Sequence, residues 1–247
     1  MQISMNLIAS TGVVLMGTVL ASAQSTAKKP NGSSVESSPS ANMFERSASG
    51  NGVTVKVARQ TAIWTTTTNG LSWLERSPNS PFRFYDVAFG NGIFVAVGNE
   101  GALVTSCDGA SWTTRNSDTD SRLRGIAFGK NMFVAVGHEG TIITSKDGIK
   151  WTTRNSLTTT RLQMVAFDRD KFVVVGWKGV ILTSSNGTRW QVRNSGISDR
   201  LDGITYRDGR FMASMTNRIV RVSTDGTTWA EPEPPPFTDR GHPSRMP

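Results

Sequence analysis

The chain repeats one pattern five times, and this period constrains its fold more than any other feature. Tryptophans recur at intervals of 39 residues, at Trp73, Trp112, Trp151, Trp190 and Trp229. Four residues before each stands an Asp or Asn that is followed by Gly, at Asn69, Asp108, Asp147, Asn186 and Asp225. Each unit holds four short runs rich in β-branched and aromatic residues, without the spacing of an amphipathic helix. A period of about 40 residues with four strands per unit is typical of propeller blades.

We therefore predict an all-β protein, a β-propeller with five blades of four antiparallel strands, which fills residues 43–236. The innermost strand of the first unit and the outermost strand of the last are degenerate, as expected of terminal repeats. A ring that closes on itself leaves no long exposed sheet edge and is our first expectation. The alternatives are an open arc and a ring completed by a partner chain.

The two ends of the chain carry different patterns. Residues 1–23 are predicted to be a signal peptide, because the apolar segment 12–20 is followed by Ala21-Ser22-Ala23, a pattern that signal peptidase accepts. This predicts a secreted or periplasmic protein that does not span the membrane. The segment before Gly12 has no Lys or Arg, so an uncleaved hydrophobic N-terminus is the alternative. Residues 24–42 are predicted to be a flexible linker, and residues 237–247 a disordered tail.

Composition excludes several classes of function. Lys and Arg total 27 against 19 Asp and Glu, which gives a net charge of +8, and 19 of the 27 are arginines. With one cysteine, Cys107, and two histidines, the chain offers little for a metal site, and we expect neither metal nor cofactor. The sequence pI of about 10.1 raises the possibility of nucleic-acid binding. Basic runs with interleaved aromatic residues are missing from the sequence, which argues against a specific nucleic-acid site.

The repeated turn has the form Ser-x-Asp-Gly-x-x-Trp, at residues 106–112, 145–151 and 223–229. It resembles the Asp-box, or BNR, repeat of sialidases and of many non-enzymatic propellers, and it is similar to the repeats of the photosystem II assembly factor family. The resemblance implies a turn between the third and outermost strands. The residue types fit a structural role: Asp or Asn accepts backbone N–H bonds, Gly takes a positive φ, and Trp fills the space between blades. We therefore assign no catalytic residue to these turns.

Candidate binding residues lie on the face opposite these turns, where the hairpins between second and third strands differ from blade to blade. Trp177 is a large aromatic residue at a hairpin tip that the repeat does not require. Two arginine series run through the connections between blades: Arg76, Arg115, Arg154 and Arg193, then Arg83, Arg122, Arg161 and Arg200. The first series is expected to stack on neighbouring blades or to pair with acids such as Asp118, Asp120, Glu100 and Glu139. The second precedes the inner strands, where it forms either a basic rim for an anion or an internally paired structural feature. The candidate ligand-binding residues are Arg83, Arg122, Arg161, Arg200, Trp177, His138 and Glu139.

The sequence thus favours a secreted, non-catalytic binding or scaffold protein, with a protein or an acidic polysaccharide as its ligand. The alternative, implied by the Asp-box resemblance, is a sialidase-like glycoside hydrolase. Such enzymes use an arginine triad, a tyrosine nucleophile with a glutamate, an aspartic acid, and a Phe-Arg-Ile-Pro stretch. This chain has Pro81-Phe82-Arg83-Phe84 instead, and its two tyrosines, Tyr85 and Tyr206, are expected in the core. The similarity to photosystem II assembly factors implies a protein client, although that family forms a larger ring.

Overall fold

The structure is a computed structural model that describes residues 46–58, 61–67, 72–76, 78, 80–216 and 218–233. The predicted signal peptide, linker and tail, and Asn69, lie outside the described residues.

The described residues form five antiparallel sheets, one per repeat, which we call blades 1 to 5. Blade 1 contains β1 (Arg46–Gly50), β2 (Val53–Val57), β3 (Ile63–Thr67) and β4 (Leu74–Arg76). Blade 2 contains β5 (Phe84–Gly90), β6 (Ile93–Gly98), β7 (Leu103–Ser106) and β8 (Thr113–Thr114). Blade 3 contains β9 (Leu123–Gly129), β10 (Met132–Gly137), β11 (Ile142–Ser145) and β12 (Thr152–Arg154). Blade 4 contains β13 (Leu162–Asp168), β14 (Lys171–Gly176), β15 (Ile181–Ser184) and β16 (Gln191–Arg193). Blade 5 contains β17 (Gly203–Arg207), β18 (Arg210–Met215) and β19 (Arg218–Ser223), with a bridge between Val222 and Ala230 in place of a fourth strand.

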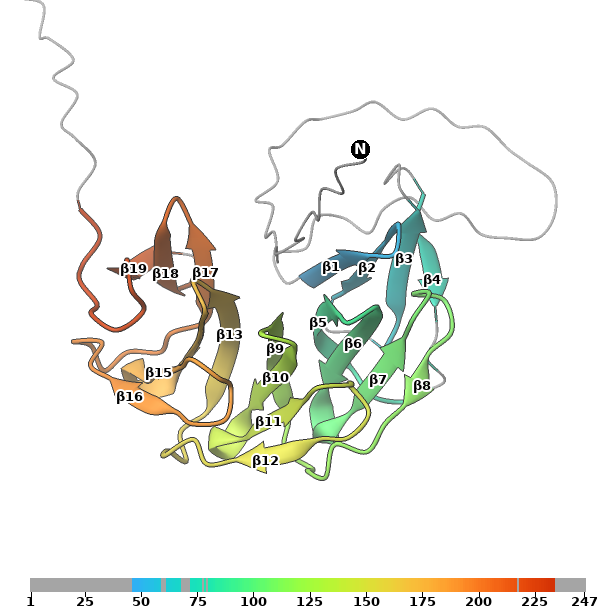
Figure 1. Cartoon of the computed structure of the whole chain (residues 1–247), viewed down its shortest axis with the longest axis horizontal. Coiled ribbons are helices and arrows are strands. Elements are labelled where there is room, and N and C mark those ends of the chain that lie inside the picture. The colour runs from blue at the N-terminus through green and yellow to red at the C-terminus, as the bar shows by residue number, and fades with distance from the viewer. Residues whose placement is uncertain are drawn as a thin grey trace, which may run out of the picture.

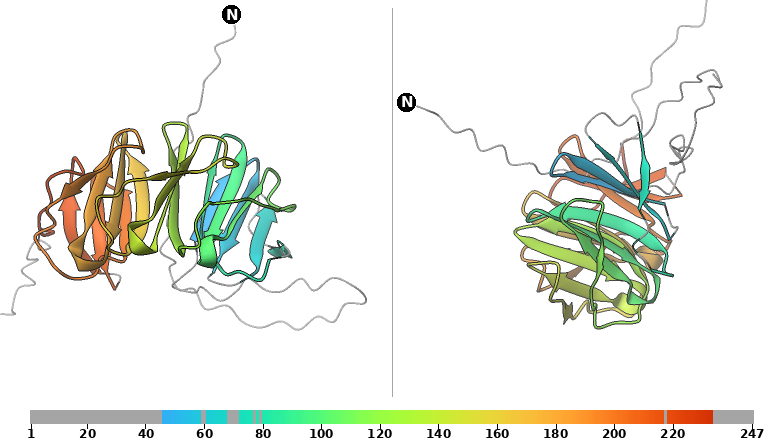
Figure 2. Two further views of the ribbon diagram at one scale, coloured as in Figure 1. Left: turned by 90° about the horizontal axis from the view of Figure 1, so that it is seen from below. Right: turned by 90° about the vertical axis from the view of Figure 1, so that its right-hand side faces the viewer.

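The predicted propeller fold is confirmed, but the described residues do not form the closed ring that we expected. The innermost strands contact one another in sequence, from β1 to β5, β9, β13 and β17. Figure 1 shows the blades as an open arc, with blades 1 and 5 on opposite sides of the opening. Seen edge-on, the sheets stand side by side along this arc (Figure 2). The inner strands still approach a common axis, since Nη2 of Arg46 in blade 1 reaches Sδ of Met164 in blade 4 at 3.7 Å.

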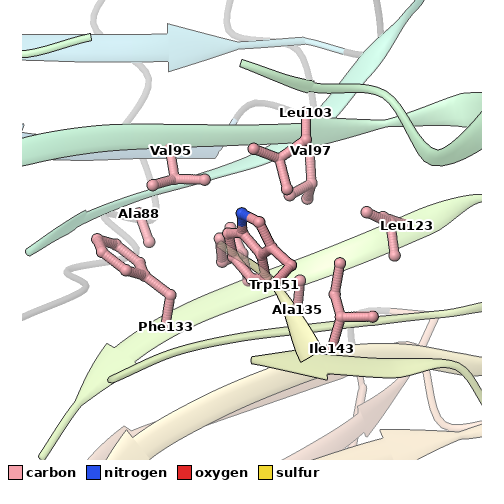
Figure 3. Close-up of a cluster of buried hydrophobic side chains, with 10 residues drawn as sticks. Ala88, Val95, Val97, Leu103, Leu123, Phe133, Ala135, Ile143 and Trp151 are labelled. Carbon is pink, nitrogen blue, oxygen red and sulfur yellow. The ribbon is translucent and has the colours of Figure 1, made fainter. Parts of the chain in front are cut away.

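The hydrophobic core lies between neighbouring blades. Figure 3 shows Trp151 of blade 3 among Val95 and Val97 of blade 2 and Phe133 of its own blade, and all four side chains are buried. Trp112, Trp190 and Trp229 likewise pack in the clusters that join their blades to the preceding one. No blade precedes blade 1 among the described residues, and there Trp73 packs with Ala62 and Trp64 of its own sheet. Each blade after the first is therefore held by burial against the one before it.

The repeated turns, which we call the Trp turns, connect the third strand to the outer edge of the blade in blades 2 to 5. In blade 3, Oδ1 of Asp147 accepts the backbone N–H groups of Ile149 and Lys150, both at 2.9 Å. Gly148 has a φ of 70°, a left-handed conformation that glycine adopts without steric cost. Nε1 of Trp151 donates to the Gly148 carbonyl at 3.0 Å, which closes the turn. The same carboxylate or amide bonds recur at Asp108, Asn186 and Asp225.

Candidate functional site on the hairpin rim

The hairpins between second and third strands end in three short 3-10 turns on the face opposite the Trp turns. These are η1 (Asn99–Gly101), η2 (His138–Gly140) and η3 (Trp177–Gly179). The first residue of each turn donates its backbone N–H to an arginine carbonyl of the second series: Asn99 to Arg83, His138 to Arg122 and Trp177 to Arg161, at 2.9 to 3.0 Å. The backbone thus fixes each of these arginines beside the hairpin tip of its own blade.

The arginine side chains reach toward the preceding blade. Nε of Arg161 in blade 4 donates to Nε2 of His138 in blade 3 at 2.6 Å. The Arg161 guanidinium also lies 4.7 Å from the ring centroid of Trp177, and that of Arg200 lies 6.0 Å from the same ring. One blade further back, Arg122 and Arg124 lie 5.8 and 4.8 Å from the Tyr85 ring. We call this alternation of guanidinium groups and rings the rim cluster; it comprises Tyr85, Arg122, Arg124, His138, Arg161, Trp177 and Arg200.

The rim cluster is strongly electropositive. Partial burial, together with the charges of Arg161, Arg122 and Arg124, lowers the pKa of His138 to about 4. Burial and the neighbouring charges of Arg122 and Arg200 also lower the pKa of Arg161. His138 is therefore neutral near pH 7 and serves as a hydrogen-bond acceptor for Arg161.

A carboxylate, that of Asp202, is attached to this cluster. Nε of Arg200 forms an ion pair with Asp202 at 2.7 Å, and both groups are partly exposed. Nε of Arg124 donates to Oε1 of Gln163 at 3.2 Å, and the Gln163 amide in turn lies 3.5 Å from Asp202. Asp202 thus offsets charge at one end of the rim cluster.

The structure groups five of the seven predicted residues and separates two. Arg161 contacts both His138 and Trp177, and Arg200 lies over the same Trp177 ring. Arg122 lies over Tyr85, where its charge acts on His138 and Arg161. Arg83 is exposed, and its backbone N–H donates to Oδ1 of Asn99 at 2.6 Å. Glu139 is exposed at the apex of η2 with a φ of 56°. No interaction of the Arg83 or Glu139 side chains ties them to the cluster among the described residues.

The first arginine series is structural, but its partners differ from those expected. Nε of Arg154 donates to Oγ1 of Thr144 on the adjacent third strand at 2.9 Å. The same bond recurs from Arg115 to Thr105, from Arg193 to Thr183 and from Arg76 to Thr65. The acids that were expected as partners lie on the loops. Each threonine instead lies on the adjacent third strand, two residues beyond the one that pairs with the arginine: Arg154 pairs with Ile142 and bonds to Thr144.

The prediction for Tyr85 was wrong. Tyr85 is half-buried in the rim cluster, while its neighbour Phe84 takes the core position. Sequence reasoning also overlooked Leu157, which is 57% exposed and has a φ of 62°. The repeat places Asp118 and Gly196 at the same point, so the departure from small or polar residues was the available signal. A leucine with this positive φ is strained. Because its side chain is exposed, burial of apolar surface does not offset the strain.

The rim cluster is a surface and not an enclosed cavity. Two shallow hollows elsewhere on the described residues have volumes of about 250 and 170 Å³, and neither is lined by a residue of the rim cluster. Among the described residues, no group of three or more His, Cys, Asp or Glu side chains could hold a metal ion. No helix in the described part of the chain is long and apolar enough to cross a membrane.

Comparisons with known proteins agree with this geometry at the level of the fold. The sequence matches no family model and no curated protein. A structure of YCF48 bound to a D1 peptide superposes with a TM-score of 0.56 at 20% identity, over 76% of this chain and 66% of that one. YCF48 from Cyanidioschyzon merolae gives 0.55 at 14% identity, over 76% and 72%. A nidogen/laminin complex gives 0.55 at 12% identity, over 71% and 73%. The chain therefore has the fold of a β-propeller, with five blades in its described part.

Proposed function

We propose that this protein is a non-catalytic scaffold that binds an anionic segment of a partner protein at the rim cluster. Arg122, Arg161 and Arg200 would bind its carboxylates, and Trp177 would provide an aromatic contact. The proposal covers the hairpin face alone and gives the Trp turns a purely architectural role.

The convergence of three arginines from successive blades carries this proposal. Their like charges repel one another, as the lowered pKa of Arg161 reflects. Asp202 pairs with Arg200, and a further anion beside Arg122 and Arg161 would relieve the remaining repulsion. Guanidinium groups bind carboxylates through paired hydrogen bonds, and their fixed positions beside the hairpin tips reduce the cost of ordering them.

Two features favour a protein over a polysaccharide ligand. The rim cluster lies on an open surface and carries exposed apolar groups nearby, at Trp177, which is 37% exposed, and at Leu157 in the adjoining connection. Aromatic and arginine side chains are enriched where proteins bind proteins. The similar YCF48 structure holds a peptide of the D1 protein, which supports a peptide ligand here by analogy of fold.

Two further assignments belong to the proposal. The Trp turns match the Asp-box pattern in sequence and in their hydrogen bonds, so we assign them to that repeat class. The leader at residues 1–23 would direct the protein to a secreted or periplasmic location. Sequencing the N-terminus of the protein recovered from its host tests the second assignment, because cleavage after Ala23 leaves Gln24 as the first residue.

A binding titration of the native protein and of a Trp177 variant tests the binding proposal. A glutamate-rich peptide, a serine-rich peptide of equal length and heparin are each added to purified protein, and binding is measured by fluorescence anisotropy. The proposal predicts that the acidic peptide binds and that the neutral peptide does not. It also predicts that Trp177→Ala weakens binding of the acidic peptide. Preferential binding of heparin that Trp177→Ala leaves unchanged would point instead to a polysaccharide and to bulk charge.

The sialidase alternative requires a carboxylate that activates a tyrosine. The groups placed against Tyr85 are the guanidinium groups of Arg122 and Arg124, which cannot accept its proton. Tyr206 packs edge-on against Phe211, with its hydroxyl bonded to Arg169. Release of product from a fluorogenic sialoside by the purified protein would replace the binding proposal with this one.

A further inference from the structure

The regular contact between two blades has a constant design. Two aromatic rings face the preceding blade, one from the inner strand and one from the second strand. In blade 3 these are Phe128 and Phe133, with ring centroids 4.7 Å apart. Phe128 seats on Gly90 of blade 2, where an added Cβ would come within 2.1 Å of the ring. The equivalent pairs are Phe89 with Phe94, Phe167 with Phe172, and Tyr206 with Phe211.

Blade 1 lacks this aromatic pair. In the hairpin register of blade 2, Phe89 lies opposite Phe94. The same register in blade 1 places Ser49 opposite Thr54. Their hydroxyl groups form a hydrogen bond of 2.8 Å, so the site of the two rings is occupied by a small polar pair.

The next position on the same face changes in the same way. Blade 2 has Val87 opposite Ala96, both buried against blade 1. Blade 1 has Ser47 opposite Lys56 at this position. Four of the apolar side chains with which blade 2 faces blade 1, those of Phe89, Phe94, Val87 and Ala96, are thus replaced by polar or charged ones in blade 1. An ammonium group at the centre of such a contact would be costly to bury.

The outer half of the face is covered by blade 1 itself. Trp64 stands where blade 2 has the smaller Val104, as the pairing with Lys56 and with Ala96 shows. Trp64 and Trp73 are 8% and 6% exposed, and Nζ of Lys56 lies 4.1 Å from the Trp73 ring centroid. The tryptophan that other blades bury against their predecessor is therefore buried here by side chains of its own sheet.

Blade 5 offers no matching seat at the other end of the arc. At the position of Gly90 and Gly129 it carries the exposed Arg207. Blade 4 has Asp168 there and receives Tyr206, whose hydroxyl bonds to Arg169, in place of a phenylalanine. Contact between blade 5 and blade 1 would bring Arg207 against serine and threonine hydroxyls, without a ring to bury.

We propose that the outward face of blade 1, formed by Ser47, Ser49, Thr54, Lys56, Trp64 and Trp73, is a polar cap on which no propeller blade packs, whether from this chain or from a second copy. Terminal repeats of stacked proteins carry a polar outer face for the same reason, because an apolar one would associate. The cap explains why the five blades stay open as an arc, and it keeps the axial side of the inner strands accessible through the opening.

Cysteine labelling measures directly whether this face is covered. Thr54→Cys and Ala96→Cys are made separately in a Cys107→Ser background, and alkylation of the folded proteins is timed over a range of protein concentrations. We expect Thr54→Cys to react within about tenfold of the rate of exposed Cys107 in the native chain, and Ala96→Cys on the order of a hundredfold more slowly, since it needs local opening. Protection of Thr54→Cys at every concentration would mean that blade 5 closes the ring, and protection that grows with concentration would mean that a second copy covers it. Either result overturns the cap.

Restoring the apolar face gives an independent test. The variant Ser49→Phe/Thr54→Phe/Lys56→Ala is expected to self-associate in sedimentation velocity, while the native protein remains monomeric. The control Ser49→Thr/Thr54→Ser keeps the face polar and should sediment as the native protein does. A native protein that forms a dimer which Lys56→Glu dissociates would identify the face as an interface and reject the cap.

Discussion

Nε of Arg161 donates to Nε2 of His138 across the boundary between blades 4 and 3, at 2.6 Å. This bond requires the imidazole to be neutral, and burial with the nearby arginines lowers the pKa of His138 to about 4. The unfolded chain protonates this histidine near pH 6.5, so between pH 6.5 and about 4 it binds more protons than the folded state. Stability should therefore fall as the pH is lowered through this window, and His138→Gln should remove that part of the dependence.

An anion bound at the rim cluster would neutralise the arginines and raise the pKa of His138. The imidazole proton resonances, assigned with His138→Gln, report the titration directly. We expect a midpoint near pH 4 for the free protein and a higher one with a bound glutamate-rich peptide. A midpoint near 6.5 in the free protein would show that the arginines do not act on His138.

Trp151 and Trp177 provide a matched pair for the packing of the blades. Trp151→Ala opens a cavity between blades 2 and 3 and should cost about 3–5 kcal/mol of unfolding free energy. For a domain of this size that lowers the melting temperature by about 10 °C or more. Trp177→Ala removes the same side chain from an exposed hairpin tip and should leave the melting temperature nearly unchanged. Equal shifts for the two variants in a calorimetric melt would contradict the packing role of the Trp turns.

Asp147 tests the hydrogen bonds of those turns. Asp147→Ala leaves the N–H groups of Ile149 and Lys150 without their partner and should cost about 1–2 kcal/mol. Asp147→Asn should cost much less, because Asn186 accepts the equivalent pair of bonds in blade 4. These backbone bonds also lower the pKa of Asp147, so its carboxylate stabilises the fold above about pH 4 and loses that effect as the pH falls. Urea denaturation at pH 7 and pH 3 separates the two variants, and an alanine variant as stable as the native protein would exclude the capping role.

The pH dependence that Asp86 gives to stability should have the opposite sign. It is buried on β5 and accepts N–H bonds from Ile126 and Val87, both at 2.9 Å. Burial raises its pKa to about 6, against the opposing effects of Arg46 and of the two backbone bonds. Its contribution to stability therefore decreases as the pH rises from about 4 to about 6.

Carboxyl carbon NMR measures this titration, and Arg46→Met should move the Asp86 midpoint upward by removing a positive charge. A midpoint near 4 that does not respond to Arg46→Met would mean that blade 1 does not reach the axis as the structure has it.

The sequence predicts the blades well because their determinants are local and repeated. The 39-residue spacing of the tryptophans fixes the number of units, and turn residues such as Gly148 fix the ends of strands. The open arc follows instead from the angle between sheets, which no period in the sequence specifies. Ser49 and Thr54 did carry the relevant signal, since they replace an aromatic pair that each later repeat retains, but its meaning depends on knowing which face they occupy.

The rim cluster was predictable in part for the same reason. Arg122, Arg161 and Arg200 share a repeat position, so their grouping follows from the symmetry of the blades. The contributions of Tyr85 and Asp202 do not follow, because these two residues share one repeat position with Arg124 and Gln163 and the residue type there changes from blade to blade. Leu157 is visible only as a departure from the repeat.

We expect the rim cluster, and not the basic charge of the whole molecule, to bind the anionic partner. Calorimetric titration of a glutamate-rich peptide into two charge-matched variants separates these possibilities. Arg122→Gln/Arg161→Gln/Arg200→Gln removes three charges from the rim, and Lys146→Gln/Lys150→Gln/Arg189→Gln removes three from the Trp-turn face. We expect the rim variant to lose at least about tenfold in affinity, equivalent to about 1.4 kcal/mol, while the other variant binds as the native protein does. Equal losses in both variants, or none in the rim variant, would contradict the account.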